Sequence, residues 1–359
     1  MGCYKEVGQL MRKFANAVLC LAGLTVAYGQ KTEISPVAHV IIIGIDGLSV
    51  DGVTTAKTPR LHELMARGAW TLEARGVMPT LSAPNWASMI TGAGPEQHGI
   101  TSNGVLLQKM VTLPAVCRDA DGMFPTMFEV LRMQRPATHI AIFHDWPGFS
   151  DLVEKHAPNI MEHERGAEKT IQTAIQYWKE NRPELMFVHL DNVDHTGHEY
   201  AWGSREYYKA VADADGYVGQ MIDMLKSVSA QDSTYVLVTS DHGGKGREHG
   251  KNSLTEIQIP WILVGPNVVA GRVASSVYTF DTAATIAWIF DLNPPDCWIG
   301  RPIVSAFAPA MTAARNLERH ETQGNCGPQR TSTGVIAWGL PLDGADSGHP
   351  ANAAGKGQN

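Results

Sequence analysis

The chain has 359 residues, of which 44% are hydrophobic and 18% are charged, and its formal net charge is −7. This composition is that of a folded globular protein and excludes a wholly disordered, collagen-like or coiled-coil chain. The acidic balance argues against a broad nucleic-acid interface, so we expect no binding to nucleic-acid duplexes. Phosphate could still bind beside a local positive source such as a metal ion or a helix N-terminus.

The N-terminus has the pattern of a secretory signal peptide. Three basic residues precede a short apolar run over residues 14–26, and small residues stand at positions 27 and 29, where a signal peptidase cleaves. The run is too short for a transmembrane helix, which needs about 20 residues. We therefore expect residues 1–29 to be removed and the mature chain to be exported, to the periplasm or the extracellular space, without a membrane span.

Short apolar runs then alternate with amphipathic segments. The run over residues 39–45 is continuous, which is typical of a strand buried on both faces. The other expected strands lie at residues 140–143, 185–190, 235–239 and 261–264. Helices are expected at residues 58–66, 126–133, 167–179, 204–228 and 282–290. This alternation predicts an α/β fold with α/β/α layers around a central, largely parallel sheet.

The domain boundaries follow from composition. We expect one main domain over residues 30–310, in which the loop-rich segment 104–167 forms an inserted cap. Residues 311–359 are expected to be a C-terminal extension, disordered over residues 344–359, where Gly, Ala and polar residues show no apolar periodicity.

Three cysteines remain in the expected mature chain, namely Cys117, Cys297 and Cys326. An odd number in an exported protein allows one disulfide and one free thiol. We favour the pair Cys297 and Cys326. No CxxC pattern is present, so a thiolate metal site is not expected.

Acidic and histidine side chains follow three of the apolar runs. The residues concerned are Asp46, Asp194, His198, Asp241, His242 and, a few residues later, His249. Each alone could be a turn, a helix cap or a surface residue. Because ligands bind beyond the carboxyl ends of parallel strands, we expect these side chains to meet at one edge of the sheet. Three Asp and three His suit zinc or a similar divalent ion.

Six segments in the same order carry a family resemblance across about residues 38–266. They are GIDG, MPTLSAPNWASMITG, PEQHGITSN, DHTGHEYAWGS, SDHGG and REHGKNSLTEIQIPWILVGP. The chain resembles the alkaline phosphatase superfamily and, within it, the type I phosphodiesterase/nucleotide pyrophosphatase group. The resemblance implies an alkaline phosphatase-like catalytic domain and two bound metal ions, normally zinc.

The resemblance also implies a role for each matched residue. Asp46, Asp241 and His242 would hold one metal ion together with Ser82, and Asp194, His198 and His249 would hold the other. Ser82 would be the nucleophile and form a covalent phosphoserine, while Asn103 would bind a phosphate oxygen. A serine hydroxyl needs such activation, and a helix that begins after Ser82 would direct N–H groups at the phosphate.

The implied function is a secreted two-metal phosphoester hydrolase acting on phosphodiesters or nucleotide pyrophosphates. The nucleophile in that group is usually threonine, whereas this chain has Ser82, as phosphomonoesterases do. A phosphomonoesterase or phosphonate hydrolase therefore remains the alternative, although no arginine motif for a phosphate dianion is present. The sequence SAPNW lacks the arginine of the sulfatase pattern, which disfavours a sulfatase, and the intact ligand set disfavours a non-catalytic metal-binding protein.

Several neighbouring residues do not match ligand positions. We expect His98 to be structural. His189, Asp191 and His195 flank the DHTGH motif in sequence but are not at its ligand positions, and we expect His195 either to support a ligand or to lie at the surface. Trp86 and Trp146, the latter in a WPG segment like that of the nucleotide pyrophosphatases, are candidates for a leaving-group or base-stacking pocket, or else for the core. The small phosphorylated substrate is not defined further by the sequence, and neither is the oligomeric state.

Overall fold

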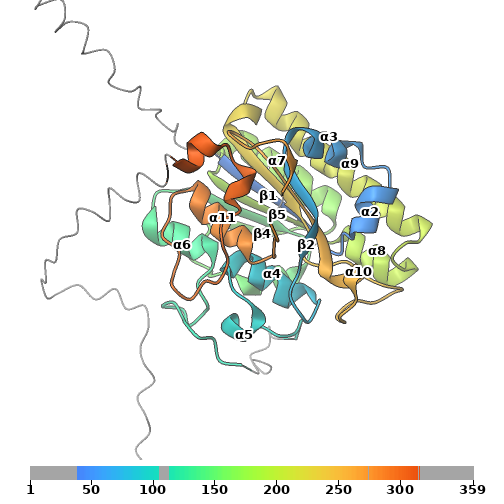
Figure 1. The fold of residues 1–359 in the computed structure, drawn as a ribbon, viewed down its shortest axis with the longest axis horizontal. Coiled ribbons are helices and arrows are strands. Elements are labelled where there is room, and N and C mark those ends of the chain that lie inside the picture. Colours follow the sequence, from blue (N-terminus) through green and yellow to red (C-terminus); the bar gives the residue numbers. More distant parts are fainter. Residues whose placement is uncertain (1–38, 105–112, 274, 314, 316–359) are drawn as a thin grey trace, which may run out of the picture. The chain divides into compact units, whose positions relative to one another are not determined.

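The computed structural model describes residues 39–104, 113–273, 275–313 and 315. The expected signal peptide, Cys326 and the C-terminal extension beyond residue 315 lie outside these residues. Within the described residues, eight strands form one sheet in the order β4-β3-β5-β1-β6-β7-β2-β8 (Figure 1). The strands are β1 (His39–Ile45), β2 (Ala69–Arg75), β3 (Ile140–His144), β4 (Ile160–His163), β5 (Leu185–Leu190), β6 (Thr234–Thr239), β7 (Gln258–Val264) and β8 (Gly271–Arg272).

Only β7 runs against its neighbours. It pairs antiparallel with β6 and β2, whereas the other pairings in the sheet are parallel. The prediction of a largely parallel sheet is therefore confirmed. The sheet also includes β2, β4 and β8, which were not predicted.

The central strand β1 shows why its apolar run is continuous. Ile41, Ile43 and Ile45 point into one hydrophobic core, while Val40 and Ile42 point into another. Successive side chains of a strand alternate between its faces, so a strand covered on both sides needs apolar residues at every position. Gly44 interrupts the run because a Cβ there would lie 2.5 Å from the indole of Trp86.

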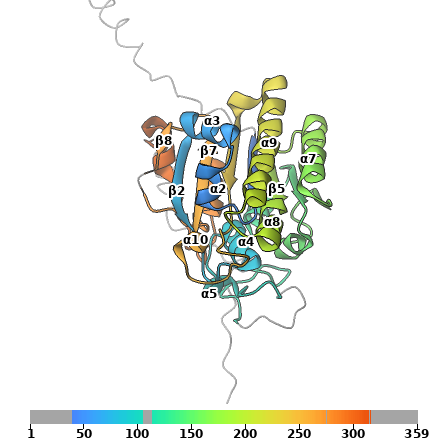
Figure 2. The same cartoon turned by 90° about the vertical axis from the view of Figure 1, so that its right-hand side faces the viewer.

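Helices cover both faces of the sheet. One face carries α2 (Val50–Thr55), α3 (Pro59–Arg67), α7 (Ala167–Asn181), α8 (Asn192–Tyr200) and α9 (Arg205–Ser227), and Figure 2 shows α3, α9 and α7 side by side there. The other carries α4 (Ser82–Thr91), α6 (Met127–Gln134) and α11 (Asp281–Ile289), which contact one another. Short segments complete the described elements: α5 (Pro95–His98), α10 (Leu254–Ile257), and the 3-10 turns η2 (Pro147–Leu152), η3 (Gln231–Ser233) and η4 (Val304–Ala306). The predicted α/β/α layering is confirmed.

Much of the segment expected to form a cap belongs to the core layers. Residues 113–167 supply α6, β3 and β4, and β3 pairs with both β5 and β4 inside the sheet. Residues 105–112 lie outside the described residues. No helix among the described residues is long and apolar enough to span a membrane.

The disulfide differs from the expected one. Cys117 bonds to Cys297, with 6.4 Å between their Cα atoms, across a sequence separation of 180 residues. The expected pair Cys297–Cys326 is therefore wrong. Pairing depends on which Cα atoms the fold brings within about 7 Å, and the positions of the cysteines in the sequence do not show this.

A buried carboxyl makes the stability of this fold depend on pH. Glu154 is fully buried and accepts hydrogen bonds from the N–H and hydroxyl of Thr126. Burial raises the pKa of Glu154 from its ordinary 4.5 to about 8. The folded state therefore holds this proton more tightly than the unfolded chain, and its stabilising effect is lost as the pH rises from about 4.5 to about 8.

We expect Glu154→Gln to weaken this loss of stability, because the amide stays neutral. The contribution of Glu154 has a slope of at most about 1.4 kcal/mol per pH unit. Urea unfolding of both proteins at several pH values between 5 and 8 measures the difference. Parallel stability curves for the two proteins would show that Glu154 does not titrate in this range.

Candidate functional site

The predicted ligand residues meet at the carboxyl edge of the sheet. Asp46 follows β1, Asp194 lies in the first turn of α8 after β5, and Asp241 and His242 follow β6. Strands β5, β1 and β6 are neighbours, so these positions lie next to one another. Figure 2 shows α4, α8 and α10 gathered at one end of the sheet. The side chains of Asp46, Asp194, Asp241 and His242 are all buried.

Helix α8 explains the spacing of one pair. Asp194 and His198 are four residues apart and therefore lie on the same face of the helix. The Nε2 atom of His198 lies 3.4 Å from Asp194 Oδ2 and 3.1 Å from Nε2 of His249. His198 is half-exposed, whereas His249 is buried at the side chain.

We call the six predicted Asp and His ligands the cluster: Asp46, Asp194, His198, Asp241, His242 and His249. Its three histidines are oriented in the same way. Their Nδ1 atoms face backbone carbonyls: His242 that of Gly243 at 2.9 Å, His249 that of Thr80 at 2.7 Å, and His198 that of Arg247 at 2.9 Å. A carbonyl can only accept, so Nδ1 carries a proton, and in the neutral imidazole Nε2 is left with a lone pair. In that tautomer the Nε2 atoms of His198 and His249, 3.1 Å apart, have no proton between them.

The carboxylates of the cluster have oxygens that a cation could bind. Asp46 Oδ1, Asp194 Oδ1 and Asp241 Oδ2 are buried without a hydrogen-bond partner. They lie 3.1 to 3.6 Å from the Nε2 atoms of His242 or His249. Buried polar atoms normally have partners, and a divalent ion would satisfy oxygen and nitrogen lone pairs together. The donor set therefore fits metal binding.

The atoms fall into two main groups that share His242. In each group the ligand atoms lie within 4.8 Å of one another: Asp46, Asp241 and His242 form one, and Asp194, His242 and His249 the other. Asp191, which was not expected to be a ligand, groups in the same way with Asp46 and Asp194.

Burial also sets the protonation of the cluster. Burial, together with the charge of His249, lowers the pKa of His242 to about 3, so its imidazole is neutral. Burial and the nearby charge of Asp46 raise the pKa of Asp241 well above its ordinary value, and burial does the same for Asp194. Carboxylates packed this closely repel one another unless positive charge is added.

The expected nucleophile lies at the start of α4. Ser82 is buried, and its Oγ lies 3.3 Å from Nε2 of His242. The side chain of Asn85 holds the preceding loop, because it bonds the backbone of Val77, Pro79 and Leu81. The N-cap residue Leu81 makes no side-chain capping bond to the helix, so its first-turn N–H groups need other partners.

Asn103 lies against the same helix end. Its Oδ1 accepts a hydrogen bond from the N–H of Ala83 at 2.9 Å. This contact identifies the amide oxygen and leaves the Nδ2 group as a donor. The side chain is exposed, so a bound oxyanion could reach it.

Thr80 ties the nucleophile loop to the loop that carries His249. Its hydroxyl donates to the carbonyl of Lys251 at 2.7 Å and accepts from the N–H of Gly250 at 2.9 Å. Its carbonyl accepts from Nδ1 of His249. Thr80 was not predicted from the sequence, because a single hydroxyl between Pro79 and Leu81 forms no pattern.

Trp86 and His189 contact the predicted ligand Asp46, and Asp145 contacts His189. His189 Nε2 lies 3.2 Å from Asp46 Oδ2, His189 Nδ1 lies 3.3 Å from Asp145 Oδ1, and Trp86 Nε1 donates to Asp46 Oδ2 at 2.9 Å. Burial alone would lower the pKa of His189, but its contacts with Asp145 and Asp46 raise it to about 10. Trp86 is fully buried, so it belongs to the core and cannot stack on a leaving group.

The remaining residues singled out from the sequence, His195, His98 and Trp146, differ in how exposed they are. His195 is 76% exposed at its side chain and lies on the surface. His98 is buried and accepts the N–H of Ile100, so its other nitrogen donates to Ser88. Trp146 is half-buried, and its ring centroid lies 6.1 Å from that of His189.

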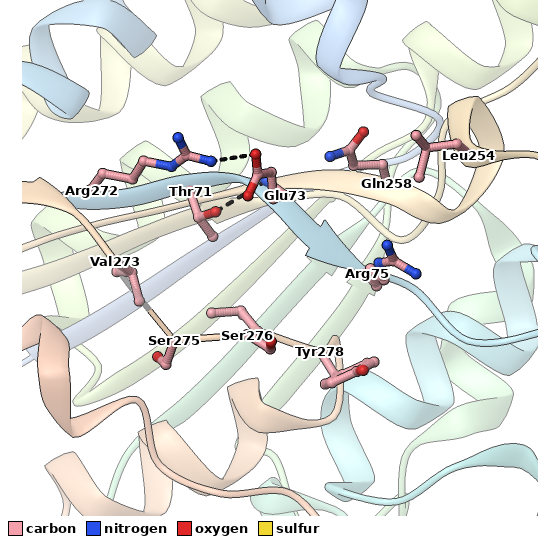
Figure 3. A pocket seen from close by; sticks show the side chains of 11 residues that line it. Thr71, Glu73, Arg75, Leu254, Gln258, Arg272, Val273, Ser275, Ser276 and Tyr278 are labelled. Atoms are coloured by element: carbon pink, nitrogen blue, oxygen red, sulfur yellow. Dashed lines mark hydrogen bonds and ion pairs between the residues drawn. The ribbon is translucent and has the colours of Figure 1, made fainter.

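Two surface hollows lie near β7. One of about 740 Å³ runs along β2 and β8, where Arg272 pairs with Glu73 (Figure 3), and none of the predicted ligands lines it. The other, of about 770 Å³, is lined by Trp202 and Lys245, and the Trp202 ring packs against His198 and His249. None of the predicted ligands lines the second hollow either, and Trp202 lies between this hollow and the two histidines.

Proteins with similar sequences are named as phosphodiesterases. Human ectonucleotide pyrophosphatase/phosphodiesterase family member 1 is 27% identical over 214 residues, covering 56% of this chain and 23% of that protein. Venom phosphodiesterase 2 of Crotalus adamanteus is 24% identical over 307 residues, covering 79% of this chain and 36% of that protein. The chain thus spans between about a quarter and a third of these relatives.

Solved structures share the fold. Murine ectonucleotide pyrophosphatase/phosphodiesterase 5 superposes with a TM-score of 0.59 at 17% identity, covering 72% of this chain and 96% of that one. A mutant of the alkaline phosphatase PafA superposes with a TM-score of 0.64 at 9% identity, covering 76% of this chain and 99% of that one. Identities this low establish an alkaline phosphatase-like fold and nothing finer.

The match to a family model is more specific than these superpositions. The model for type I phosphodiesterase/nucleotide pyrophosphatase covers residues 40–254, which include the whole cluster and Ser82. The match extends over more than half of the chain, and the chain belongs to the type I phosphodiesterase/nucleotide pyrophosphatase family.

Proposed function

We propose that the protein is an exported, two-metal phosphoester hydrolase that acts on phosphodiesters or nucleotide pyrophosphates. The proposal rests on one observation. Buried Asp oxygens that have no hydrogen-bond partner lie together with His Nε2 atoms, and the Ser82 hydroxyl is next to them. We take residues 30–310 as the catalytic domain. Family membership and the names of the relatives support the reaction class.

Asp46, Asp241, His242 and Ser82 would hold one divalent ion, and Asp194, His198 and His249 the other. The Asp and His donors suit zinc. When bound, the ions would supply positive charge that stabilises the Ser82 alkoxide and the oxygens of the phosphate. His198 and His249 are already oriented for this by their Nδ1 contacts with backbone carbonyls.

The chemistry of the chain itself would run in two displacements. Ser82 Oγ gives its proton to solvent water and bonds to phosphorus, the bond from phosphorus to the leaving oxygen breaks, and the leaving oxygen takes a proton from solvent. A water molecule then attacks the phosphoserine and gives one proton to solvent, the bond between phosphorus and Oγ breaks, and Ser82 Oγ takes a proton from solvent. Asn103 Nδ2 would donate to a phosphate oxygen throughout, because its Oδ1 is already held by Ala83.

Two observations bear on the substrate. Trp146 is half-buried next to His189 and could stack on a nucleobase. A structure of murine ectonucleotide pyrophosphatase/phosphodiesterase 5 holds AMP. We therefore favour nucleotide substrates, with phosphomonoesters or phosphonates as the alternative because the nucleophile is serine. Export of this chain is also part of the proposal, since relatives include ectoenzymes and a venom enzyme.

A substrate panel tests the proposal. The zinc-loaded protein should hydrolyse bis-p-nitrophenyl phosphate and p-nitrophenyl nucleotides faster than p-nitrophenyl phosphate, and should leave p-nitrophenyl sulfate intact. A monoester requires extra positive contacts for its second charge. Faster hydrolysis of the monoester would support the alternative, and no hydrolysis of any phosphoester would refute the proposed function.

We expect Thr80→Val to weaken metal binding at the group that includes His249. The substitution keeps the shape of the side chain but removes two hydrogen bonds between the Ser82 loop and the His249 loop. The expected loss in unfolding free energy is about 1–3 kcal/mol. Zinc titration and urea unfolding measure both effects. Thr80→Ser, which keeps the hydroxyl, should bind zinc like the unmodified chain, and equal affinity in Thr80→Val would contradict the prediction.

A further inference from the structure

Three side chains form a buried row along the carboxyl edge of the sheet. Asp145 follows β3, His189 lies in β5 and Asp46 follows β1, and these strands are neighbours in that order. His189 is in register with His144 on one side and Gly44 on the other. The topology therefore places one imidazole between two carboxylates.

The contacts in this row use both nitrogens of the imidazole. Nδ1 lies 3.3 Å from Asp145 Oδ1, and Nε2 lies 3.2 Å from Asp46 Oδ2. His189 is fully buried, and the side chains of Asp145 and Asp46 are 2% and 1% exposed. The rings of Trp86, Phe149 and Trp146 surround the imidazole at 4.8, 5.3 and 6.1 Å between centroids. Carboxylates can only accept, so an imidazolium that donates from both nitrogens satisfies them both.

The two oxygens of Asp46 are used differently. Oδ2 accepts from Trp86 Nε1 and faces His189 Nε2, whereas Oδ1 has no hydrogen-bond partner and faces the metal-ligand cluster. Two donors on one oxygen fix the rotation of the carboxylate. Neither of the other two carboxylates in the cluster, those of Asp194 and Asp241, is held by a charged group in this way among the described residues.

We propose that His189, held by Asp145, is a positioning residue that directs Asp46 Oδ1 at the metal site of Asp46, Asp241 and His242. This inference rests on the proposed metal sites, and it assigns to His189 and Asp145 a role that the family resemblance did not. It predicts a selective effect, because the row ends at Asp46 and does not extend to Asp194, His198 or His249. Partners that orient a metal ligand typically contribute 10- to 100-fold to metal affinity.

Metal affinity measured without substrate tests the inference. His189→Leu should lower the affinity of one of the two Co²⁺ equivalents by about 10- to 100-fold and change the visible spectrum of that equivalent alone. The other equivalent should keep its affinity and spectrum. His98→Gln is the control for the loss of a buried imidazole, since His98 bonds Ser88 and Ile100 and touches no carboxylate of the cluster.

A double variant separates positioning from a general structural effect. In His189→Gln combined with Asp145→Asn, the new amide at position 145 could donate to the Gln oxygen, whose own amide could then donate to Asp46 Oδ2. This double variant should regain at least part of the affinity lost in His189→Gln alone. It also tests the inference if His189→Leu does not fold.

Two outcomes would overturn the inference: wild-type affinity and spectrum for both equivalents in His189→Leu, or no recovery in the double variant relative to His189→Gln. Either outcome is independent of catalysis. A chain that binds two metal ions as described but hydrolyses no phosphoester would instead refute the proposed function and leave the role of His189 standing.

Discussion

Replacing Ser82 with alanine should reduce phosphodiester hydrolysis by about a thousand-fold or more, because removal of a nucleophile abolishes the covalent route. The Ser82 hydroxyl lies beside the cluster, with Oγ 3.3 Å from His242 Nε2. Loss of one small hydroxyl at the start of α4 changes little packing, so the variant should stay folded. Initial rates on bis-p-nitrophenyl phosphate under saturating zinc measure the effect.

Ser88→Ala provides the control from the same helix. Ser88 is buried and bonds His98, so its loss tests whether a missing hydroxyl in α4 is enough to reduce the rate. We expect its rate to stay within about ten-fold of the unmodified chain, since one hydrogen bond contributes about 1 kcal/mol. A Ser82→Ala protein that hydrolyses the diester near the wild-type rate would show that another group attacks the phosphorus.

Removing the metal ions should abolish phosphate binding as well as hydrolysis. The cluster contains the carboxyl groups of Asp46, Asp194 and Asp241, so without the ions it places negative or neutral groups where the phosphate anion would bind. Inorganic phosphate should therefore bind the zinc-loaded protein and not the chelated protein, as measured by calorimetry at constant ionic strength. The added positive charge of two divalent ions reverses the sign of the site.

Restoring zinc should recover both properties together. Magnesium should recover them poorly, because imidazole nitrogens suit zinc better than magnesium. Phosphate binding that survives chelation would indicate a different source of positive charge, and hydrolysis that survives it would contradict the role given to the Asp and His cluster.

The sequence predicted the central strands well because they are buried on both faces. The continuous apolar runs of β1 and β5 were identified with their observed bounds, and α9 was recognised from its apolar stripe. Strand β2 was missed because Glu73 and Arg75 interrupt its pattern, and it lies near the sheet edge. Strand β4 is a four-residue edge strand, too short to show a period.

Helix α8 was missed for a different reason. Its sequence NVDHTGHEY is mostly polar, so it lacks an apolar stripe, although the Asp194 and His198 spacing is helical. The meeting of the acidic and histidine residues at one edge could be predicted, because polar residues that follow buried runs stand out.

The partners of these residues could not be predicted. His189 lies within an apolar strand and resembles an ordinary core residue, and Trp86 resembles a substrate-stacking residue until its burial is known. The Cys117–Cys297 bond and the contact between Asp145 and His189 each join segments far apart in sequence. Such pairs depend on strand order, which local patterns do not contain.

We expect Ser82 to form the covalent intermediate only when metal ions are bound. Mass spectrometry of the protein after acid quenching during turnover of a nucleotide diester detects this intermediate. We predict a nucleoside monophosphate on the peptide that contains Ser82, present with zinc and absent after chelation. Turnover with no adduct on Ser82 under any quench time, or an adduct on another residue, would contradict the account.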